Sequence, residues 1–129
     1  METKTSIAVC VPFLVVENIE KTIEWYEGIG FTCTETNHVW EPDGELNWAR
    51  IEWNGAAFMI GPDERHKLSK TKDAGLWFDV RSLDWIVEHL KINHIPFNTE
   101  EETFYGRKVI SFKDINDFVV SFSSEIPDK

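Results

Sequence analysis

The sequence has little of several things that would mark a special class of protein. Only two of its 129 residues are cysteines, Cys10 and Cys33, too few for the disulfide framework of a small secreted domain. No apolar run approaches the ~20 residues that span a membrane, and the N-terminus lacks the basic and apolar regions of a signal peptide. We therefore expect a cytoplasmic protein with reduced thiols and no membrane partner.

Positive charge is also scarce. The chain has 13 Lys and Arg against 23 Asp and Glu, a formal net charge of −10. Nucleic-acid binding needs a basic surface, so we expect no nucleic-acid partner. The acidic balance permits a cationic partner, although acidic surfaces often serve solubility alone. With 42% apolar and 28% charged residues, the composition is that of one ordinary globular domain.

What the sequence does contain is an internal repeat. Val16-Glu17-Asn18-Ile19 recurs as Val80-Arg81-Ser82-Leu83, 64 residues later. Asn18 and Ser82 are good helix N-caps, and an apolar stripe at helical spacing follows each of them. The stripe residues are Ile19, Ile23, Tyr26 and Ile29 in the first half and Leu83, Ile86, Val87 and Leu90 in the second.

Each predicted helix is preceded by one strand-like run and followed by three. These runs lie near 6–16, 31–37, 47–53 and 56–61 in the first half, and near 74–81, 97–103, 107–113 and 118–124 in the second. Asn54-Gly55 is a strong hairpin signal, and residues 114–117 form the matching turn. We predict an α+β fold with two βαβββ modules, 1–62 and 74–129, joined by a polar linker at 63–73 within a single domain of residues 1–129.

Apolar alternation divides each strand into two faces. The apolar face of the first sheet, expected under the helix, holds Ala49, Ile51, Trp53, Ala56, Phe58 and Ile60. The opposite face is mixed and carries Trp48 and Glu52, and in the second half Trp77 and Asp79 are likewise opposite the core positions. We predict curled, mixed sheets around a shared cleft lined by these faces. A solvent-exposed sheet face is the alternative, but two large aromatics argue for a contact surface.

These features resemble the vicinal oxygen chelate superfamily, which contains glyoxalase I, extradiol dioxygenases, fosfomycin-resistance enzymes and bleomycin-resistance proteins. The resemblance rests on residues 13–26 with Gly30-Phe31, on Phe78-Asp79-Val80-Arg81-Ser82-Leu83, and on residues 105–114. The chain departs from the family at Asp114-Ile115-Asn116-Asp117, where Asp-Pro-Asp-Gly is usual.

The resemblance also implies where a metal would be bound. Enzymes of this family use His, Glu or Gln side chains, and the matching positions are Val11, Met59, Gly75 and Ser121. None of these side chains is a suitable ligand for a divalent ion. The resemblance therefore implies a metal-free member without a cofactor, closest to the bleomycin-resistance-like branch.

We accordingly predict a metal-independent homodimeric protein that binds or sequesters a flat or cationic small molecule by stacking and cation–π contacts. The predicted ligand-binding residues are Trp48, Arg50, Glu52, Met59, Trp77, Asp79, Tyr105 and Ser121, with Trp40 as a further aromatic candidate. A metal-dependent lyase or dioxygenase of the same superfamily and a partner-interaction domain remain alternatives. In a further alternative, Trp48 and Trp77 fill a dimer interface and bind no ligand.

Overall fold

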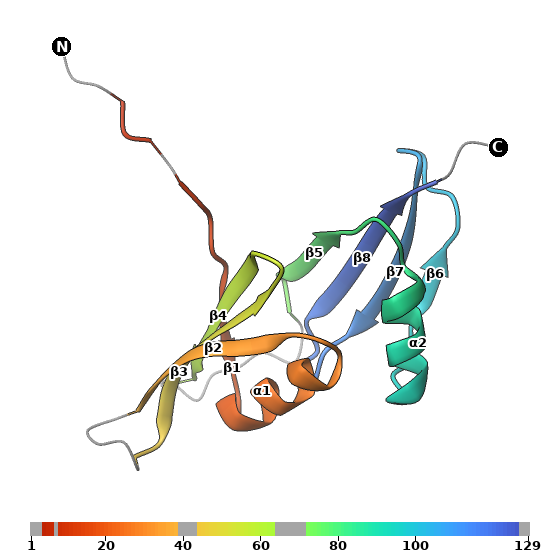
Figure 1. The fold of residues 1–129 in the computed structure, drawn as a ribbon. Helices are drawn as coiled ribbons and strands as arrows, with labels where there is room; N and C mark the ends of the chain where they lie inside the picture. The colour runs from red at the N-terminus through yellow and green to blue at the C-terminus, as the bar shows by residue number, and fades with distance from the viewer. Residues whose placement is uncertain (1–3, 7, 39–43, 64–71, 127–129) are drawn as a thin grey trace.

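The structure, a computed structural model, describes residues 4–6, 8–38, 44–63 and 72–126. Its elements are β1 (Phe13–Val16), α1 (Ile19–Gly28), β2 (Thr32–His38), β3 (Leu46–Trp53), β4 (Ala56–Pro62), β5 (Gly75–Asp79), α2 (Asp84–Ile92), β6 (Asn98–Glu100), β7 (Arg107–Lys113) and β8 (Val119–Glu125). The two βαβββ modules lie next to each other, each with its own sheet and helix (Figure 1). In the described part of the chain, no helix has the length and apolar character needed to cross a membrane.

Both sheets have the same topology. The strand orders are β1-β4-β3-β2 and β5-β8-β7-β6. In each module the first strand pairs in parallel with the last one, and the remaining pairs are antiparallel. The predicted α+β architecture of two mixed, four-stranded sheets is therefore confirmed. The sheets remain open, and each leaves edge strands, β1 and β2 in one and β5 and β6 in the other.

The two helices begin differently. Asn18 caps α1 as predicted, because its side-chain oxygen accepts a hydrogen bond of 2.9 Å from the amide of Lys21. In α2, which begins at Asp84, the cap position is Leu83 rather than the predicted Ser82, and Leu83 supplies no capping side-chain hydrogen bond. Ser82 still contributes, because its hydroxyl accepts from the amide of Asp84 at 3.2 Å.

Two predicted strands are shorter in the structure. The first was expected over 6–16, but only 13–16 pair with β4, and the described residues before them extend away from the body (Figure 1). Pro12 accepts a bond from the amide of Met59 but has no N–H with which to continue the ladder. The strand expected over 97–103 stops at Glu100 because residues 103–106 form a turn, closed by a bond from the Gly106 amide to the Thr103 carbonyl.

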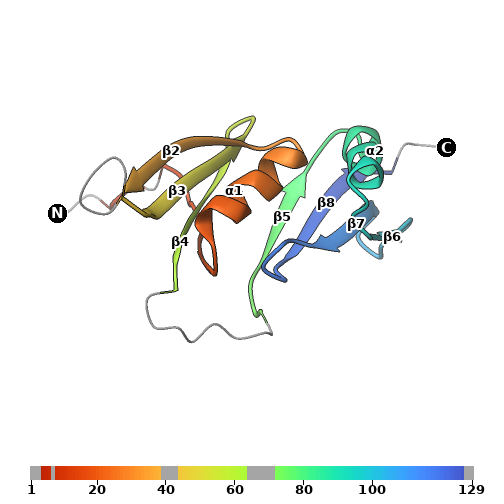
Figure 2. The same cartoon turned by 90° about the horizontal axis from the view of Figure 1, so that it is seen from below.

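The helix-covered faces of both sheets meet in one core. Ala49, Ile51, Phe58 and Ile60 are buried as predicted, whereas Ala56 is exposed at the tip of the β3–β4 hairpin. The cores of the two modules join where Phe31 contacts Phe78 and Trp53 contacts Phe122, at ring-centroid distances of 5.3 and 5.9 Å. Figure 2 shows the two modules side by side, with α1 in the first and α2 in the second.

A buried polar joint also links the modules. Tyr26 of α1 donates a hydrogen bond to Asp114 in the turn between β7 and β8. The other oxygen of Asp114 accepts from the amides of Asn116 and Phe118, at 2.8 and 3.0 Å, and the Asn116 side chain donates to the hydroxyl of Thr22 at 3.0 Å. A second polar contact joins the ends of the two helices, where the Asn93 side chain donates to the carbonyl of Gly28 at 3.2 Å. Residues 64–71 of the predicted linker lie outside the described residues.

Candidate ligand-binding faces

Each sheet has one face that no helix covers. Face A, on the first sheet, is defined by Phe13, Trp48, Arg50, Glu52 and Met59, whose strand positions alternate with the core residues. The ring of Phe13 lies directly over Gly61, because a Cβ added there would stand only 2.5 Å from the ring's Cζ atom. Trp48, Arg50, Glu52 and Met59 are all half-buried.

The charges of face A form a local pair. The Nε of Arg50 lies 3.2 Å from Oε1 of Glu52, and the two side chains are 29% and 32% exposed. Both residues belong to β3, two positions apart, so no other strand takes part in the pair. The predicted ligand carboxylate Glu52 is thus neutralised by the predicted ligand residue Arg50.

Face B, on the second sheet, is defined by Trp77, Asp79, Arg107, Ser121 and Ser123. The register places Trp77 of β5 beside Ser121 of β8 and Asp79 beside Ser123. Ser121 and Ser123 are buried, and the hydroxyl of Ser121 is 2.8 Å from that of Ser111 on β7. Small serines on the central strand leave room above β8 for longer side chains from its neighbours.

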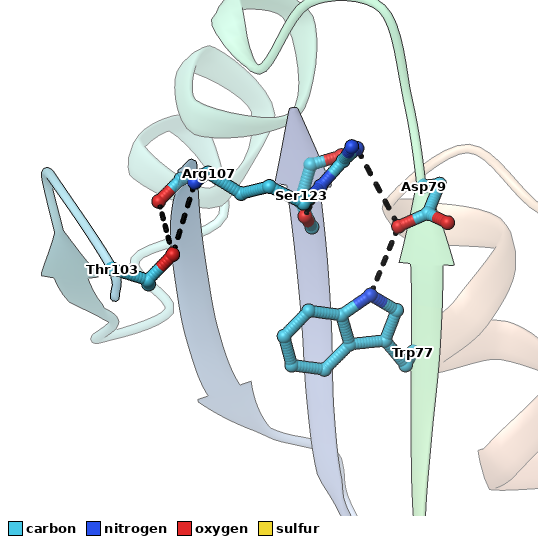
Figure 3. A network of polar contacts seen from close by, with 5 residues as sticks. All are labelled: Trp77, Asp79, Thr103, Arg107 and Ser123. Carbon is cyan, nitrogen blue, oxygen red and sulfur yellow. Dashed lines mark hydrogen bonds and ion pairs between the residues drawn. The ribbon is translucent and has the colours of Figure 1, made fainter. Parts of the chain in front are cut away.

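Arg107 uses that room to connect three strands (Figure 3). From β7 it crosses β8, where Nε donates to the hydroxyl of Ser123 and Nη2 donates to the Ser123 carbonyl at 3.2 Å. Its Nη2 also lies 3.5 Å from Oδ1 of Asp79 on β5. The same carboxylate oxygen accepts the indole N–H of Trp77 at 3.0 Å, so the network fixes the plane of an indole that is exposed to solvent.

The turn before β7 adds two more aromatic rings. The hydroxyl of buried Thr103 donates to the carbonyl of Arg107 at 2.9 Å and accepts from its amide at 3.0 Å. The turn presents Phe104, which is fully exposed, and Tyr105, which is 45% exposed. The ring of Tyr105 lies 6.3 Å from that of Trp77. An aromatic border therefore stands beside the Arg107 network.

The eight predicted site residues fall into two groups. Trp48, Arg50, Glu52 and Met59 belong to face A, whereas Trp77, Asp79 and Ser121 belong to face B and Tyr105 borders it. Among the described residues, no hydrogen bond, ion pair or ring contact joins the two groups. Within one chain, the predicted site residues of face A and face B therefore do not come together in the predicted shared cleft. Trp40 lies outside the described residues.

A separate cavity of about 420 Å³ opens where the β3–β4 hairpin meets β5. Its lining consists of Trp53, Asn54, Ala56, Phe78, Asp79, Val80, Arg81 and Phe122. Its aromatic residues are core residues of the two modules. Only Asp79 connects the cavity with the predicted ligand set.

The sequence analysis missed Arg107, Ser123, Thr103 and Phe104. A signal existed for Arg107, because Ile110 and Phe112 are core positions and strand alternation puts residue 107 on the opposite face. Ser123 follows from the same alternation along β8. No signal distinguished Thr103 and Phe104, because the turn that positions them interrupts a region expected to be a strand.

The positions that match the family's metal ligands do not form a donor set. Met59 offers a thioether on face A, Gly75 has no side chain, and the hydroxyl of Ser121 is bonded to Ser111. Thioether and serine hydroxyl groups do not fit a divalent ion of this family. In the part of the chain that the structure describes, no group of three His, Cys, Asp or Glu side chains could hold a metal ion.

Comparisons with known proteins agree with this architecture. A glyoxalase/bleomycin resistance protein/dioxygenase domain from Frankia sp. EAN1pec has a TM-score of 0.73 and 17% identity, over 95% of this chain and 100% of that one. A glyoxalase-related enzyme from Clostridium phytofermentans has a TM-score of 0.76 and 12% identity, over 97% and 100% of the two chains.

The fosfomycin resistance protein from Listeria monocytogenes, complexed with Mn(II) and sulfate, has a TM-score of 0.69 and 12% identity, over 95% of this chain and 93% of that one. No curated protein matches the sequence. The sequence model of the Glyoxalase/Bleomycin resistance protein/Dioxygenase superfamily matches residues 6–122, nearly the whole chain. The chain therefore belongs to the glyoxalase/bleomycin resistance protein/dioxygenase superfamily.

Proposed function

We propose that this chain is a metal-independent small-molecule-binding protein that holds a flat aromatic or cationic compound against faces A and B. The observation that carries the proposal is Trp77, whose side chain is 51% exposed while its indole N–H is fixed by Asp79. An exposed indole held in one orientation can stack on a ligand with little further loss of side-chain conformational entropy, because the protein has already ordered it. Tyr105 beside it extends the stacking surface.

A homodimer would complete the site. One chain leaves both helix-free faces uncovered, and an isolated open sheet face with large aromatics is typical of a contact surface. The unpaired edges of β1 and β5 are further surfaces that commonly pair with another chain. We propose that a second copy brings face B opposite face A, so that Trp48 and Trp77 border one cleft. Light scattering should then give twice the mass of one chain at micromolar concentration, and a monomer mass would contradict the dimer.

Binding can be tested with N-methylacridinium, a flat aromatic cation, by calorimetric titration and by the shift in melting temperature. The matched variants are Trp77→Phe and Trp85→Phe, because both indoles are about half exposed but Trp85 lies on α2, stacked on His89. We expect Trp77→Phe to weaken binding about 5-fold, within the range of a stacking or cation–π contact. Equal effects of the two substitutions, or no response to the probe or to other flat aromatic compounds, would contradict the proposal and favour a partner-interaction domain.

The superfamily's metal-dependent enzymes supply a second candidate function. The observation in its favour is the fold shared with a fosfomycin resistance protein that was solved with Mn(II). Elemental analysis of the purified protein for Mn, Fe, Ni and Zn separates the two candidates. We expect less than a tenth of an equivalent of each metal. A full equivalent that is lost on Ser121→Ala or Met59→Ala would favour the enzyme.

A further inference from the structure

The guanidinium of Arg107 has donors left over after its contacts within face B. Arginine carries five N–H donors. The Nε donor bonds to the Ser123 hydroxyl, and the Nη2 donors bond to the Ser123 carbonyl and pair with the carboxylate of Asp79. Among the described residues, Nη1 has no acceptor. The side chain is 24% exposed, so these donors border solvent while the rest of the group is fixed.

The acidic groups of the two faces are, by contrast, already engaged. Oδ1 of Asp79 accepts the hydrogen bond of the Trp77 indole and forms the ion pair with Arg107, and Glu52 is paired with Arg50. Oδ2 of Asp79 is the oxygen on face B that could favour a cation, since the Asp79 side chain is 69% exposed. A cation stacked on Trp77 would, however, also stand near the guanidinium of Arg107.

We infer that face B selects flat aromatic compounds that carry an oxygen acceptor, such as an aryl carboxylate, over aryl cations. The inference rests on the proposed function and names the class of ligand within it. Trp77 supplies the stacking surface, and Nη1 of Arg107 supplies a charge-assisted donor beside it for an oxygen of the ligand. Since Ser123 and Asp79 hold the guanidinium in place, little side-chain entropy is lost when the ligand binds.

The test uses three probes with one ring system: quinoline-2-carboxylate, quinoline and 1-methylquinolinium. Each is titrated calorimetrically into the full chain, at low salt and neutral pH. We expect the carboxylate to bind about 10-fold more tightly than 1-methylquinolinium, the factor that a charge-assisted hydrogen bond supplies. Arg107→Gln should abolish this preference, and Arg81→Gln, the same change at an exposed arginine outside both faces, should leave it intact.

The outcomes are distinguishable. Tighter binding of 1-methylquinolinium, or a carboxylate preference that survives Arg107→Gln, overturns the inference but leaves a binding protein. Absence of heat from all three probes with the unaltered chain overturns the inference and counts against the proposed function. Circular dichroism checks that Arg107→Gln is folded. If it is not, Arg107→Lys decides, since it keeps the charge but loses the guanidinium that bonds to Ser123 while Nη1 stays available, and it should lose most of the preference.

Discussion

Faces A and B contain the same kinds of residue, yet they organise them differently. Each carries an arginine, a carboxylate and a tryptophan. On face A, Arg50 pairs with Glu52 two positions along its own strand. On face B, Arg107 connects β7, β8 and β5 and thereby fixes Trp77. The comparison teaches that composition alone does not make a site, because only face B converts these residues into one fixed arrangement.

The residues on the central strands explain the difference. Arg107 lies over Ser123, which is fully buried and offers both a hydroxyl and a carbonyl as acceptors. The cross-strand neighbours of Arg50 are Glu35 on β2 and Met59 on β4, whose thioether is only a weak acceptor. An arginine over serine can therefore bond to the sheet beneath it, whereas an arginine beside methionine turns to the nearest carboxylate.

The largest loss of stability is expected at the buried polar joint around Asp114, because this joint holds together the two modules that carry faces A and B. Asp114→Ala removes the acceptor for Tyr26 and for the amides of Asn116 and Phe118. Leaving buried donors unpaired costs about 1–3 kcal/mol each, so we expect a loss of roughly 3 kcal/mol or more in the free energy of unfolding. Urea denaturation measures it.

Asp117→Asn is the matched control for that change. Asp117 is exposed in the same turn, and its φ of 67° is one that asparagine tolerates. We expect its free energy of unfolding to stay within about 0.5 kcal/mol of the unaltered chain, as for most surface substitutions. A loss as large as that of Asp114→Ala would show that the turn, and not the joint, is what matters.

The difference between the two arginines gives the next largest effect. Arg107→Ala leaves the hydroxyl of buried Ser123 without its donor, and we expect a cost of about 1–3 kcal/mol. Arg50→Ala removes a partly exposed ion pair, worth about 0.2–1 kcal/mol. Thermal unfolding of the two variants, each compared with the unaltered chain, makes the measurement. Equal losses would remove the contrast drawn here between faces A and B.

Most of the fold could be predicted from the sequence because it depends on local patterns. The 64-residue repeat, the alternation around Asn54-Gly55 and the helical stripes each report which residues face the core, and burial of Tyr26, Ile51 and Leu90 confirms them. The strand expected over 6–16 was wrong in its length. Alternation reveals that a segment can pair, but only the position of β4 determines how many residues do.

The candidate site was less accessible to sequence reasoning. Alternation put Arg50 and Glu52 on one face, two positions apart, so their pairing was within reach of sequence reasoning. It could not show that Asp79 meets Arg107. That outcome depends on side-chain reach across strands that are distant in sequence, since Arg107 and Asp79 are 28 positions apart. The function of both faces remains a prediction.

The pH dependence of stability offers a finer test of the joint between the modules. Burial raises the pKa of Asp114 above its ordinary value, with a smaller contribution from nearby Asp117, despite hydrogen bonds that favour the ionised form. The folded state therefore holds this proton to a higher pH than the unfolded state. The resulting stabilisation is complete below the unfolded pKa and disappears as the pH rises through the folded pKa.

Asp114→Asn isolates that contribution, because asparagine resembles the protonated acid and does not titrate. We expect the free energy of unfolding of the unaltered chain, relative to Asp114→Asn, to increase as the pH falls from 7 toward 4. Urea denaturation at a series of pH values measures the difference. A relative stability that decreases on acidification would mean that the hydrogen bonds from Tyr26 and the two amides outweigh burial.

The smallest expected effect on stability sharpens the contrast at the border of face B. Phe104 is fully exposed, so Phe104→Ala does not change the apolar surface buried within a single chain. We therefore expect an unchanged melting temperature. Its ring nevertheless lies 4.9 Å from that of Tyr105, on the turn that Thr103 ties to Arg107. If face B binds a flat aromatic compound, Phe104→Ala should weaken quinoline-2-carboxylate binding by about 2- to 5-fold, as expected for the loss of one aromatic contact.

The control is Ile92→Ala, at an exposed apolar residue at the end of α2. It should change neither the melting temperature nor the binding. Unchanged binding in both variants would place Phe104 outside the site, whereas a lowered melting temperature for Phe104→Ala alone would indicate that the ring is buried against another surface, as in the dimer proposed above.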